Sequence, residues 1–433
     1  MYVSHVSLLD FRSYQKLDIE LEPGTTTFVG SNGQGKTNLV EAIGYTATLS
    51  SHRVSTDAAL IRQGAQRAVV RTRAVRGDRA STVELEITAG RANRARINQG
   101  QIVRTRDVLG IIKTVLFAPE DLALIKGDPE VRRKFIDQLL IQLLPRAAGL
   151  LKDYDKVQRQ RSALLKNMRK GLHFSPGLDV DMLDVWDERL ADLGAQIIEL
   201  RQHVILDLSP WVEHYYRMVS GSDTTAGVEY VGTVEAAVMD MNAESAGASS
   251  VYEDFCQALS AMRKKEIDRG SCLLGPHRDD LALSVGSLPA KGYASHGESW
   301  SLALSLRLAS YEVLQGHRLD PQARDLSTFL DTGDVENSVD NQQAEESAPG
   351  LTSPQKHLVR HRIWNADSGA DAEPILILDD VFAELDAQRR SCLAQLVKSV
   401  PQVLITAAVV ADVPAELQSA SFTVSQGQVT RDR

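Results

Sequence analysis

The segment Gly30-Ser31-Asn32-Gly33-Gln34-Gly35-Lys36-Thr37 follows the pattern G-x-x-x-x-G-K-[ST] and constrains the fold more than any other part of the chain. In such a loop, glycines let successive backbone N–H groups surround a phosphate, and the N-terminus of the following helix adds partial positive charge. The flanking sequence fits, because residues 26–29 are strand-like and residues 38–43 are helix-like. A chance glycine turn is the alternative, but strand, loop and helix in this order predict a nucleotide-binding α/β domain.

Each position of this loop has an expected role. Gly30, Ser31, Asn32, Gly33, Gln34 and Gly35 are predicted to cradle the phosphates of ATP together with Lys36 and Thr37. Lys36 would also act in catalysis by reaching the β- and γ-phosphates, and the Thr37 hydroxyl would be a ligand of Mg²⁺.

A phosphate loop predicts an acidic partner at the end of a second buried strand. The apolar run 375–378 is followed directly by Asp379 and Asp380. We expect Asp379 to hold Mg²⁺ and Asp380 to orient or deprotonate the attacking water as a catalytic residue. The alternative is a pair of carboxylates that cap the start of a helix.

A third motif, Ser295-His296-Gly297-Glu298, precedes an apolar-faced helix over residues 300–314. A serine, a glycine and a helix N-terminus form an anion-binding surface. A second phosphate cradle in the same site would be redundant, so Ser295 and Gly297 are predicted to face the γ-phosphate bound by a neighbouring subunit. The alternative is a serine that only caps its own helix.

The order of expected elements predicts a parallel sheet covered by helices. Helices are predicted from Pro129 to about Ser220 with a break at Pro145, and about 252–268, 300–314 and 387–399. The apolar seam from Trp186 to Tyr215 is expected to pack on the helical run 131–168. Strands are predicted at 3–9, 17–21, 26–29, 68–74, 82–88, 281–285, 375–378 and 403–405.

Composition excludes several classes of protein. The 433 residues are 43% hydrophobic and 24% charged, which is typical of a folded protein. No apolar stretch reaches the roughly 18 residues of a membrane span, and the N-terminus does not have the pattern of a secretion signal. The three cysteines lie too far apart for a disulfide framework or a zinc ribbon. We therefore expect a cytoplasmic protein without a membrane partner.

The net charge of −9 is unevenly distributed. Residues 320–373 carry eleven acidic and four basic side chains and are expected to be disordered or a long surface loop. Residues 51–106 carry twelve arginines against four acids. Such a cluster attracts polyanions, and we expect these arginines, Arg94 and Arg96 among them, to bind DNA. The alternative is an ordinary solvated strand surface.

Six segments together resemble the ABC-type ATPase head of the SMC-like family of DNA-repair proteins, over nearly the whole chain outside 320–373. The string at 275–281 and the doubled aspartate are its most specific parts. The segments are Leu8–Tyr14, Gly30–Ile43, Ser51–Arg53, Phe117–Leu122, Gly275–Leu281 and Leu378–Asp386.

The resemblance implies a mixed sheet with flanking helices and an inserted helical arm. It assigns 1–125 to the N-terminal part of the ATPase domain, with the phosphate loop and an antiparallel lobe, and 126–250 to the arm. Residues 251–319 would carry the signature motif with Ser295 and Gly297, and 374–433 the Walker B strand with Asp379. The acidic segment 320–373 would be an insert.

The resemblance also implies a function. Members of the family clamp DNA as ATP-dependent homodimers in recombinational repair, replication restart and the SOS response. This chain would bind DNA at single-strand gaps and double-strand/single-strand junctions, hydrolyse ATP weakly, and assist recombinase loading with RecR and RecO as partners.

The sequence departs from the family pattern at several positions. Glu298, Ser299 and Trp300 follow Gly297 where glutamine and arginine are usual, and Thr406 stands where a histidine commonly follows the last core strand. Slow hydrolysis would fit these changes. His52 and Arg53 are candidates for contact with nucleotide or DNA. In the 275–281 segment, His277 and Arg278 fit either contacts with DNA or a partner subunit, or a structural turn stabilised by the aspartates that follow them.

Other classes of function remain open at this point. A monomeric P-loop phosphotransferase acting on a small molecule would not need Ser295 or Gly297. A scaffold would use ATP for assembly alone. A transporter ATPase subunit would need a matching signature and a membrane partner.

Overall fold

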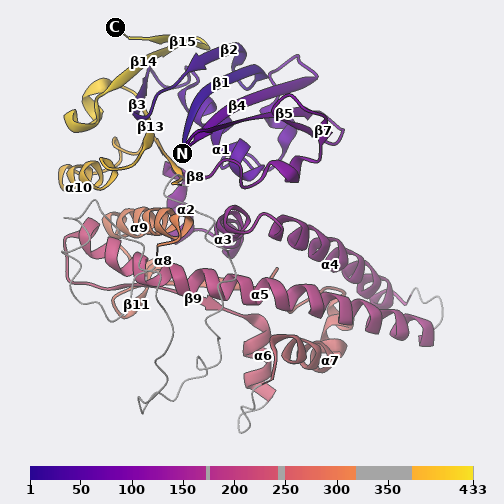
Figure 1. The fold of residues 1–433 in the computed structure, drawn as a ribbon. Coiled ribbons are helices and arrows are strands. Elements are labelled where there is room, and N and C mark those ends of the chain that lie inside the picture. Colours follow the sequence, from indigo (N-terminus) through magenta and orange to yellow (C-terminus); the bar gives the residue numbers. More distant parts are fainter. Residues whose placement is uncertain (172–175, 242–248, 318–372, 433) are drawn as a thin grey trace, which may run out of the picture.

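The computed structural model describes residues 1–171, 176–241, 249–317 and 373–432. Figure 1 shows two β-sheets at one end of the molecule and a set of long helices at the other. None of the helices in the described ranges carries an apolar stretch long enough to cross a membrane. The insert expected at 320–373 lies, apart from its last residue, outside the described residues.

A six-stranded sheet with the order β15-β14-β3-β13-β12-β8 forms the centre of the head. Its strands from β14 to β8 are parallel, and β15 pairs antiparallel with β14. The carboxyl ends of β3, β13 and β12 therefore meet at one edge, where the phosphate loop begins. The bounds are β3 (Gly24–Val29), β8 (Thr114–Phe117), β12 (Ile375–Asp379), β13 (Gln402–Ala407), β14 (Ala420–Ser425) and β15 (Gln428–Arg431).

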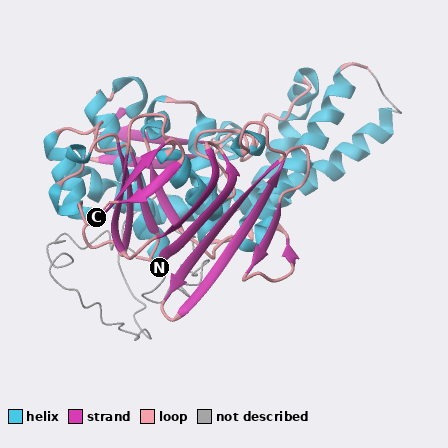
Figure 2. Cartoon of the chain, turned by 90° about the horizontal axis from the view of Figure 1, so that it is seen from above, coloured by secondary structure: helices cyan, strands magenta, loops and turns pink. Residues whose placement is uncertain are grey.

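An antiparallel sheet with the order β2-β1-β4-β5-β6-β7 lies on the other side of helix α1 (Lys36–Thr48). Figure 2 shows its long, twisted strands from above. Leu39, Val40 and Ile43 of α1 are buried in one core with apolar residues of both sheets, which fixes the helix behind the phosphate loop. The bounds are β1 (Tyr2–Phe11), β2 (Tyr14–Glu20), β4 (Arg67–Arg76), β5 (Arg79–Thr88), β6 (Arg94–Ile97) and β7 (Ile102–Val103).

Helices cover the second face of the parallel sheet. Leu376, Leu378 and Ile405 of this face share a large core with apolar residues of α9 and of the C-terminal half of α5. Trp300 of α9 is fully buried and its ring lies edge-on against Phe117. The bounds are α2 (Leu122–Lys126), α3 (Pro129–Leu143), α8 (Ala290–Tyr293), α9 (His296–Gln315) and α10 (Ala387–Val397).

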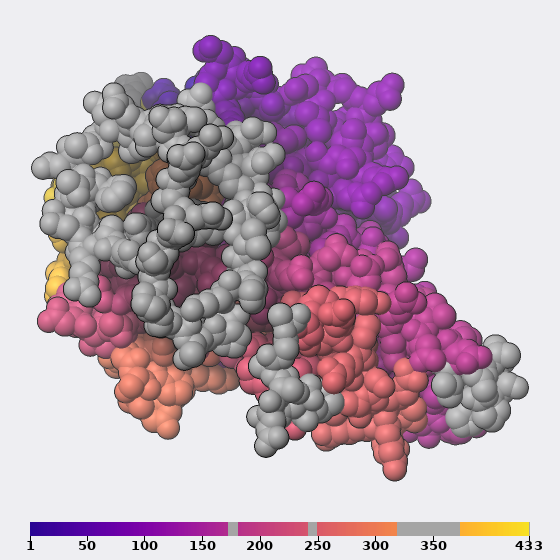
Figure 3. All heavy atoms as spheres, turned by 60° about the horizontal axis from the view of Figure 1, so that its bottom comes forward, coloured from indigo at the N-terminus to yellow at the C-terminus, as the bar shows by residue number. Residues whose placement is uncertain are grey.

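A helical arm extends from the head, and Figure 3 shows its surface in magenta and pink at the lower right, below the purple N-terminal part. It contains α4 (Ala147–Arg169), α5 (Pro176–Ser220), α6 (Thr233–Met241) and α7 (Val251–Arg269). The expected break at Pro145 is present, between α3 and α4. Helix α7, which follows residue 250, packs on α4, α5 and α6.

The seam of α5 packs on residues 131–168 as expected, but along its C-terminal half it also packs on α9, a partner that was not expected. Leu190 and Ile197 do lie against Tyr154 and Val157 of α4. Beyond them, Leu208 and its neighbours leave α4 and enter the core that includes α3 and α9. The break at Pro145 separates α3 from α4. Helix α4 therefore contacts the N-terminal half of α5, while α3 and α9 contact its C-terminal half.

The Gly275–Leu281 segment is a buried turn that connects head and arm. His277 Nδ1 lies 2.8 Å from the Tyr154 hydroxyl of α4, and Asp279 accepts hydrogen bonds from the Tyr230 hydroxyl and from Thr233. Asp280, at the start of β10, forms a bidentate ion pair with Arg132 of α3. These contacts support the structural interpretation of the segment. The small sheet here has the order β11-β10-β9, from β9 (Ala226–Val231), β10 (Asp280–Val285) and β11 (Leu288–Pro289).

His277 makes the stability of this turn depend on pH. Burial, with Arg278 nearby, lowers the pKa of His277 to about 4 from an ordinary value near 6.5. As the pH falls, His277 is therefore protonated in the unfolded chain before it is protonated in the folded one. The stability that neutral His277 contributes is complete above pH 6.5 and is lost as the pH falls toward 4. Between pH 7.5 and pH 5 we expect His277 to account for a loss of about 2 kcal/mol in the free energy of unfolding. Urea titrations of wild type and His277→Gln at both pH values test this, and equal losses in the two proteins would contradict it.

Several short elements were not expected from the sequence. They are the strands β6, β7, β8, β11, β14 and β15 and the helices α2, α6 and α8. Strand β8 is only four residues long and has no alternation, and the C-terminal pair carries few apolar residues. The predicted strands of the first hundred residues, the helices after 129 and the alternation around Asp379 are confirmed.

Candidate nucleotide-binding site

The phosphate loop needs glycine at two positions for different reasons. Gly35 has φ 112°, a left-handed conformation that only glycine adopts easily, and a Cβ there would lie 2.8 Å from Ser13 Oγ. A Cβ on Gly30 would lie 2.2 Å from the Val424 carbonyl oxygen of β14. The loop is thus held tightly between β14 and the β1–β2 turn, with Ser31, Asn32 and Gly33 exposed at its tip.

Lys36 is buried at the base of the loop. Its side chain is 3% exposed, and its amine donates a hydrogen bond to the Gly30 carbonyl at 2.8 Å. Longer contacts of 3.4 Å reach Ser31 O and Asn32 Oδ1. The ammonium group therefore lies under the mouth of the loop, 4.0 Å from Asp380 Oδ1.

Thr37, Asp379 and Thr406 form a connected group beside the loop. Asp379 is 2% exposed, and its Oδ1 accepts hydrogen bonds from Thr37 Oγ1 at 3.0 Å and Thr406 Oγ1 at 2.6 Å. Thr406 Oγ1 also accepts from the Asp380 backbone N–H at 2.9 Å. The threonine at the usual histidine position therefore orients both aspartates, which sequence reasoning had not anticipated.

Asp380 has a left-handed backbone, with φ 53°, and its side chain is one-third exposed. Burial raises the pKa of its carboxyl group, while the nearby Lys36 opposes that shift. A carboxylate of raised pKa is a stronger proton acceptor, which suits the role expected of this residue.

The buried carboxylate of Glu41 joins α1 to the two segments that flank the phosphate loop. Glu41 of α1 accepts hydrogen bonds from Arg12 Nε at 2.8 Å and from Ser51 Oγ at 2.5 Å. Arg53 Nη1 donates to Asn38 Oδ1 at 3.0 Å, and Asn38 Nδ2 donates to Ser13 Oγ at 2.9 Å. The family-like segments around residues 12 and 52 thus meet at α1.

The signature segment is built as a capping box. Ser295 Oγ accepts from the Glu298 backbone N–H, and the Glu298 carboxylate accepts from the Ser295 N–H. The serine O–H remains available as a donor. A Cβ on Gly297 would lie 3.0 Å from a guanidinium nitrogen of Arg389, which also donates to Ser301 Oγ at 2.8 Å. Arg389 pairs with Asp386, the N-cap of α10.

Arg389 supplies a positive charge that the motif itself lacks. The sequence alone gave no reason to place Arg389 there, since its partner Ser301 and the adjacent Gly297 are distant along the chain. Within the described residues, no hydrogen bond or ion pair connects Ser295 or Gly297 to the Gly30–Thr37 loop. The structure therefore unites Lys36, Thr37, Asp379 and Asp380 in one site and leaves the signature residues at a second surface.

The fold and this site define an ATPase head of the SMC type. A family model described as "RecF/RecN/SMC N terminal domain" matches residues 2–414. The structure resembles that of a protein described as "the recombination mediator protein RecF-ATPrS in RecFOR pathway", with a TM-score of 0.77 and 23% identity, covering 100% of this chain and 98% of that one. The predicted α/β head of the ABC/SMC type is confirmed by this likeness of fold.

Two curated relatives identify the family within this broader group. A protein of Frankia alni named "DNA replication and repair protein RecF" is 50% identical over 432 residues, covering 100% of both chains. A protein of Kineococcus radiotolerans with the same name is 49% identical, covering 96% of this chain and 95% of the relative. This chain belongs to the RecF family.

Proposed function

We propose that this protein is an ATP-dependent DNA-binding protein of DNA replication and recombinational repair. The observation that carries the proposal is the convergence of Lys36, Thr37, Asp379 and Asp380 at the carboxyl edge of the parallel sheet. Its curated relatives are named as DNA replication and repair proteins, which supports the choice of process.

The residues present fit ATP with Mg²⁺. Thr37 and Asp379 offer one hydroxyl and one carboxylate 3.0 Å apart, and Mg²⁺ bound to a nucleotide uses few protein ligands. Gly30 and Gly35 keep the loop clear of side chains, so that its N–H groups can surround phosphate oxygens. Bound Mg²⁺ would neutralise phosphate charge, while Lys36 would exchange its carbonyl partner for phosphate oxygens.

Hydrolysis would depend on Asp380. Its carboxylate is fixed next to Lys36 by the hydrogen bond from its backbone to Thr406. In that position it would accept the proton of the attacking water. We expect weak ATPase activity that responds to DNA.

Ser295 and Gly297 would complete the site of a second subunit. The free O–H donor of Ser295, the N-terminus of α9 and the Arg389 guanidinium form an anion-binding surface. ATP held by one copy would meet this surface of the other, giving an ATP-dependent homodimer. The dimer would clamp DNA at single-strand gaps and double-strand/single-strand junctions, with RecR and RecO as partners in recombinase loading and the SOS response.

The experiment is a measurement of molar mass in solution without nucleotide, with ADP and with ATP. Wild type should double its mass with ATP alone, because only the γ-phosphate reaches the second subunit. Ser295→Arg should stay monomeric with ATP while its affinity for ATP changes less than about threefold, since Ser295 lies outside the loop. Arg159→Ala, an exposed change on the arm, is the control and should dimerise normally.

A monomer under every condition would contradict the composite site. The alternative of a monomeric phosphotransferase would then be favoured, and a small-molecule acceptor should stimulate turnover. A dimer that persists in Ser295→Arg would equally remove the signature residues from the interface.

A further inference from the structure

His52, from the Ser51–Arg53 segment, lies beside the nucleotide site, with Nε2 3.8 Å from Asp379 Oδ2. It follows α1, where Leu49 takes a left-handed conformation and turns the chain back toward the sheet. The Ser51 hydroxyl accepts hydrogen bonds from the backbone N–H groups of Arg53 and Val54, and the Ser51 carbonyl accepts from Lys134. The backbone on both sides of His52 is therefore fixed before any ligand binds.

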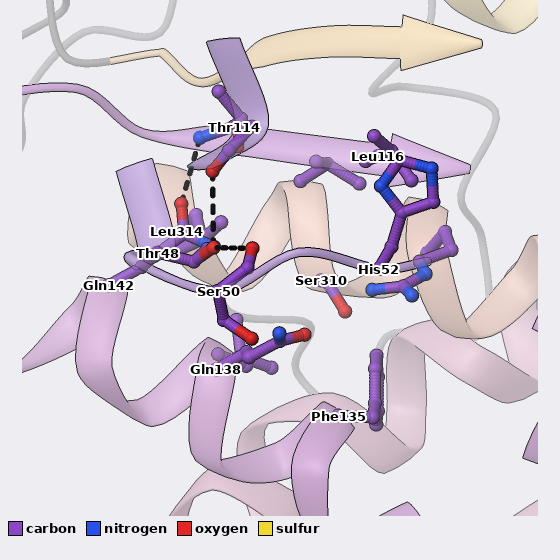
Figure 4. Close-up of a pocket in the computed structure, with 14 residues that line it drawn as sticks. Thr48, Ser50, His52, Thr114, Leu116, Phe135, Gln138, Gln142, Ser310 and Leu314 are labelled. Atoms are coloured by element: carbon purple, nitrogen blue, oxygen red, sulfur yellow. Dashed lines mark hydrogen bonds between the residues drawn. The ribbon is translucent and has the colours of Figure 1, made fainter. Parts of the chain in front are cut away.

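The imidazole of His52 has an unused polar atom. Its side chain is 16% exposed, and Nε2 is buried without a hydrogen-bond partner among the described residues. Buried polar atoms of this kind are rare and call for a specific explanation. Figure 4 shows His52 near Leu116 at one end of a pocket that Phe135 and Arg307 also line.

His52 Nε2 faces the aspartate of the candidate Mg²⁺ site. The distance to Asp379 Oδ2 is 3.8 Å, whereas the hydrogen bonds from Thr37 and Thr406 go to Oδ1. A separation of 3.8 Å is too long for a direct hydrogen bond, but one water can contact both atoms. Mg²⁺ in nucleotide sites keeps several of its waters.

We propose that His52 is a positioning residue whose Nε2 hydrogen-bonds a water of the Mg²⁺ shell together with Asp379 Oδ2. The inference rests on the proposed ATP site and deepens it. His52 lies in the connection between α1 and β4. It would serve Asp379 Oδ2, whereas Thr406 donates to Oδ1 of the same aspartate and accepts from the Asp380 N–H. Ligands in the outer shell of a metal commonly change its affinity by 10–100-fold.

The test measures the binding of a fluorescent ATP analogue at increasing MgCl₂ and, separately, in EDTA. His52→Phe keeps a planar ring but has no polar atom, and His52→Gln restores a polar atom at similar reach. We expect His52→Phe to raise the half-saturating Mg²⁺ concentration about tenfold and to leave affinity in EDTA unchanged. His52→Gln should recover most of the loss.

His203→Phe on α5 is the matched control and should behave as wild type, because its Nδ1 hydrogen-bonds Glu199 O of the same helix and His203 lies outside the nucleotide site. If His52→Phe does not fold, His52→Asn takes its place with the same expectation, since it withdraws the polar atom from Asp379. An unchanged Mg²⁺ requirement in the folded variant would overturn the inference and assign His52 to packing. Wild type that binds no nucleotide with Mg²⁺ would overturn the proposed function itself.

Discussion

Replacing Arg161 with methionine is expected to lower the free energy of unfolding of the arm by about 3–5 kcal/mol, because it leaves the buried Glu266 carboxylate without its cation and removes one of the two arginines that pair with Asp187. The Arg161 and Glu266 side chains are both fully buried. Arg161 donates to Asp187 Oδ1 at 2.5 Å, to Glu266 Oε2 at 2.6 Å and to Cys272 Sγ at 3.3 Å. The group joins α4, α5 and α7.

The effect should be confined to the arm and absent from surface arginines. Hydrogen exchange of α4, α5 and α7 should accelerate, while α1 of the head keeps its protection. Arg159→Ala breaks an exposed pair with Asp155 and should cost no more than about 0.5 kcal/mol. Adding Glu266→Gln to Arg161→Met should recover part of the loss, since it removes the charge left unpaired, whereas Asp187 keeps its ion pair with Arg263. A loss below about 1 kcal/mol in Arg161→Met would show that the buried group does not stabilise the arm.

The sequence predicted the nucleotide site because its determinants are local. The loop from Gly30 to Thr37 lies between its strand and helix, and Asp379 follows its own strand directly. Parallel pairing then brings the two motifs together, with β13 between β3 and β12. Both motifs directly follow strands of one parallel sheet, so the direction of the strands alone places them at the same edge.

The sequence patterns could not predict contacts between segments that are distant along the chain. The double hydrogen bond of Thr406, the Arg389 guanidinium beside Gly297 and the orientation of His52 toward Asp379 each depend on tertiary packing. One signal was available and unused. The spacing from Ser295 to Glu298 is that of a capping box, and the same pattern begins α7 at Ser250. Capping geometry alone therefore does not distinguish a nucleotide-facing helix from an ordinary one.

Some arginines of the antiparallel sheet are already paired with carboxylates and are therefore less available to bind phosphate. On the outer face, Glu84 lies opposite Arg71 of β4 and opposite Arg96 of β6, and it forms an ion pair with Arg71. Glu86 forms an ion pair with Arg67. Within the described part of the chain, Arg94 and Arg96 take part in no ion pair, and both are exposed. They are therefore the best-placed residues of this face to bind phosphate.

Charge reversal of Arg94 and Arg96 to glutamate should weaken DNA binding about 100-fold or more near 0.1 M salt. The slope of log affinity against log salt should become shallower by about two, because each arginine that neutralises a phosphate releases about one counterion. Fluorescence anisotropy with a gapped duplex over a salt series measures both quantities in the presence of ATP. Arg159→Glu with Arg189→Glu makes the same change of charge on exposed sites of the arm and should leave the slope unchanged. Equal losses in the two double variants would mean that net charge, and not this face, determines DNA affinity.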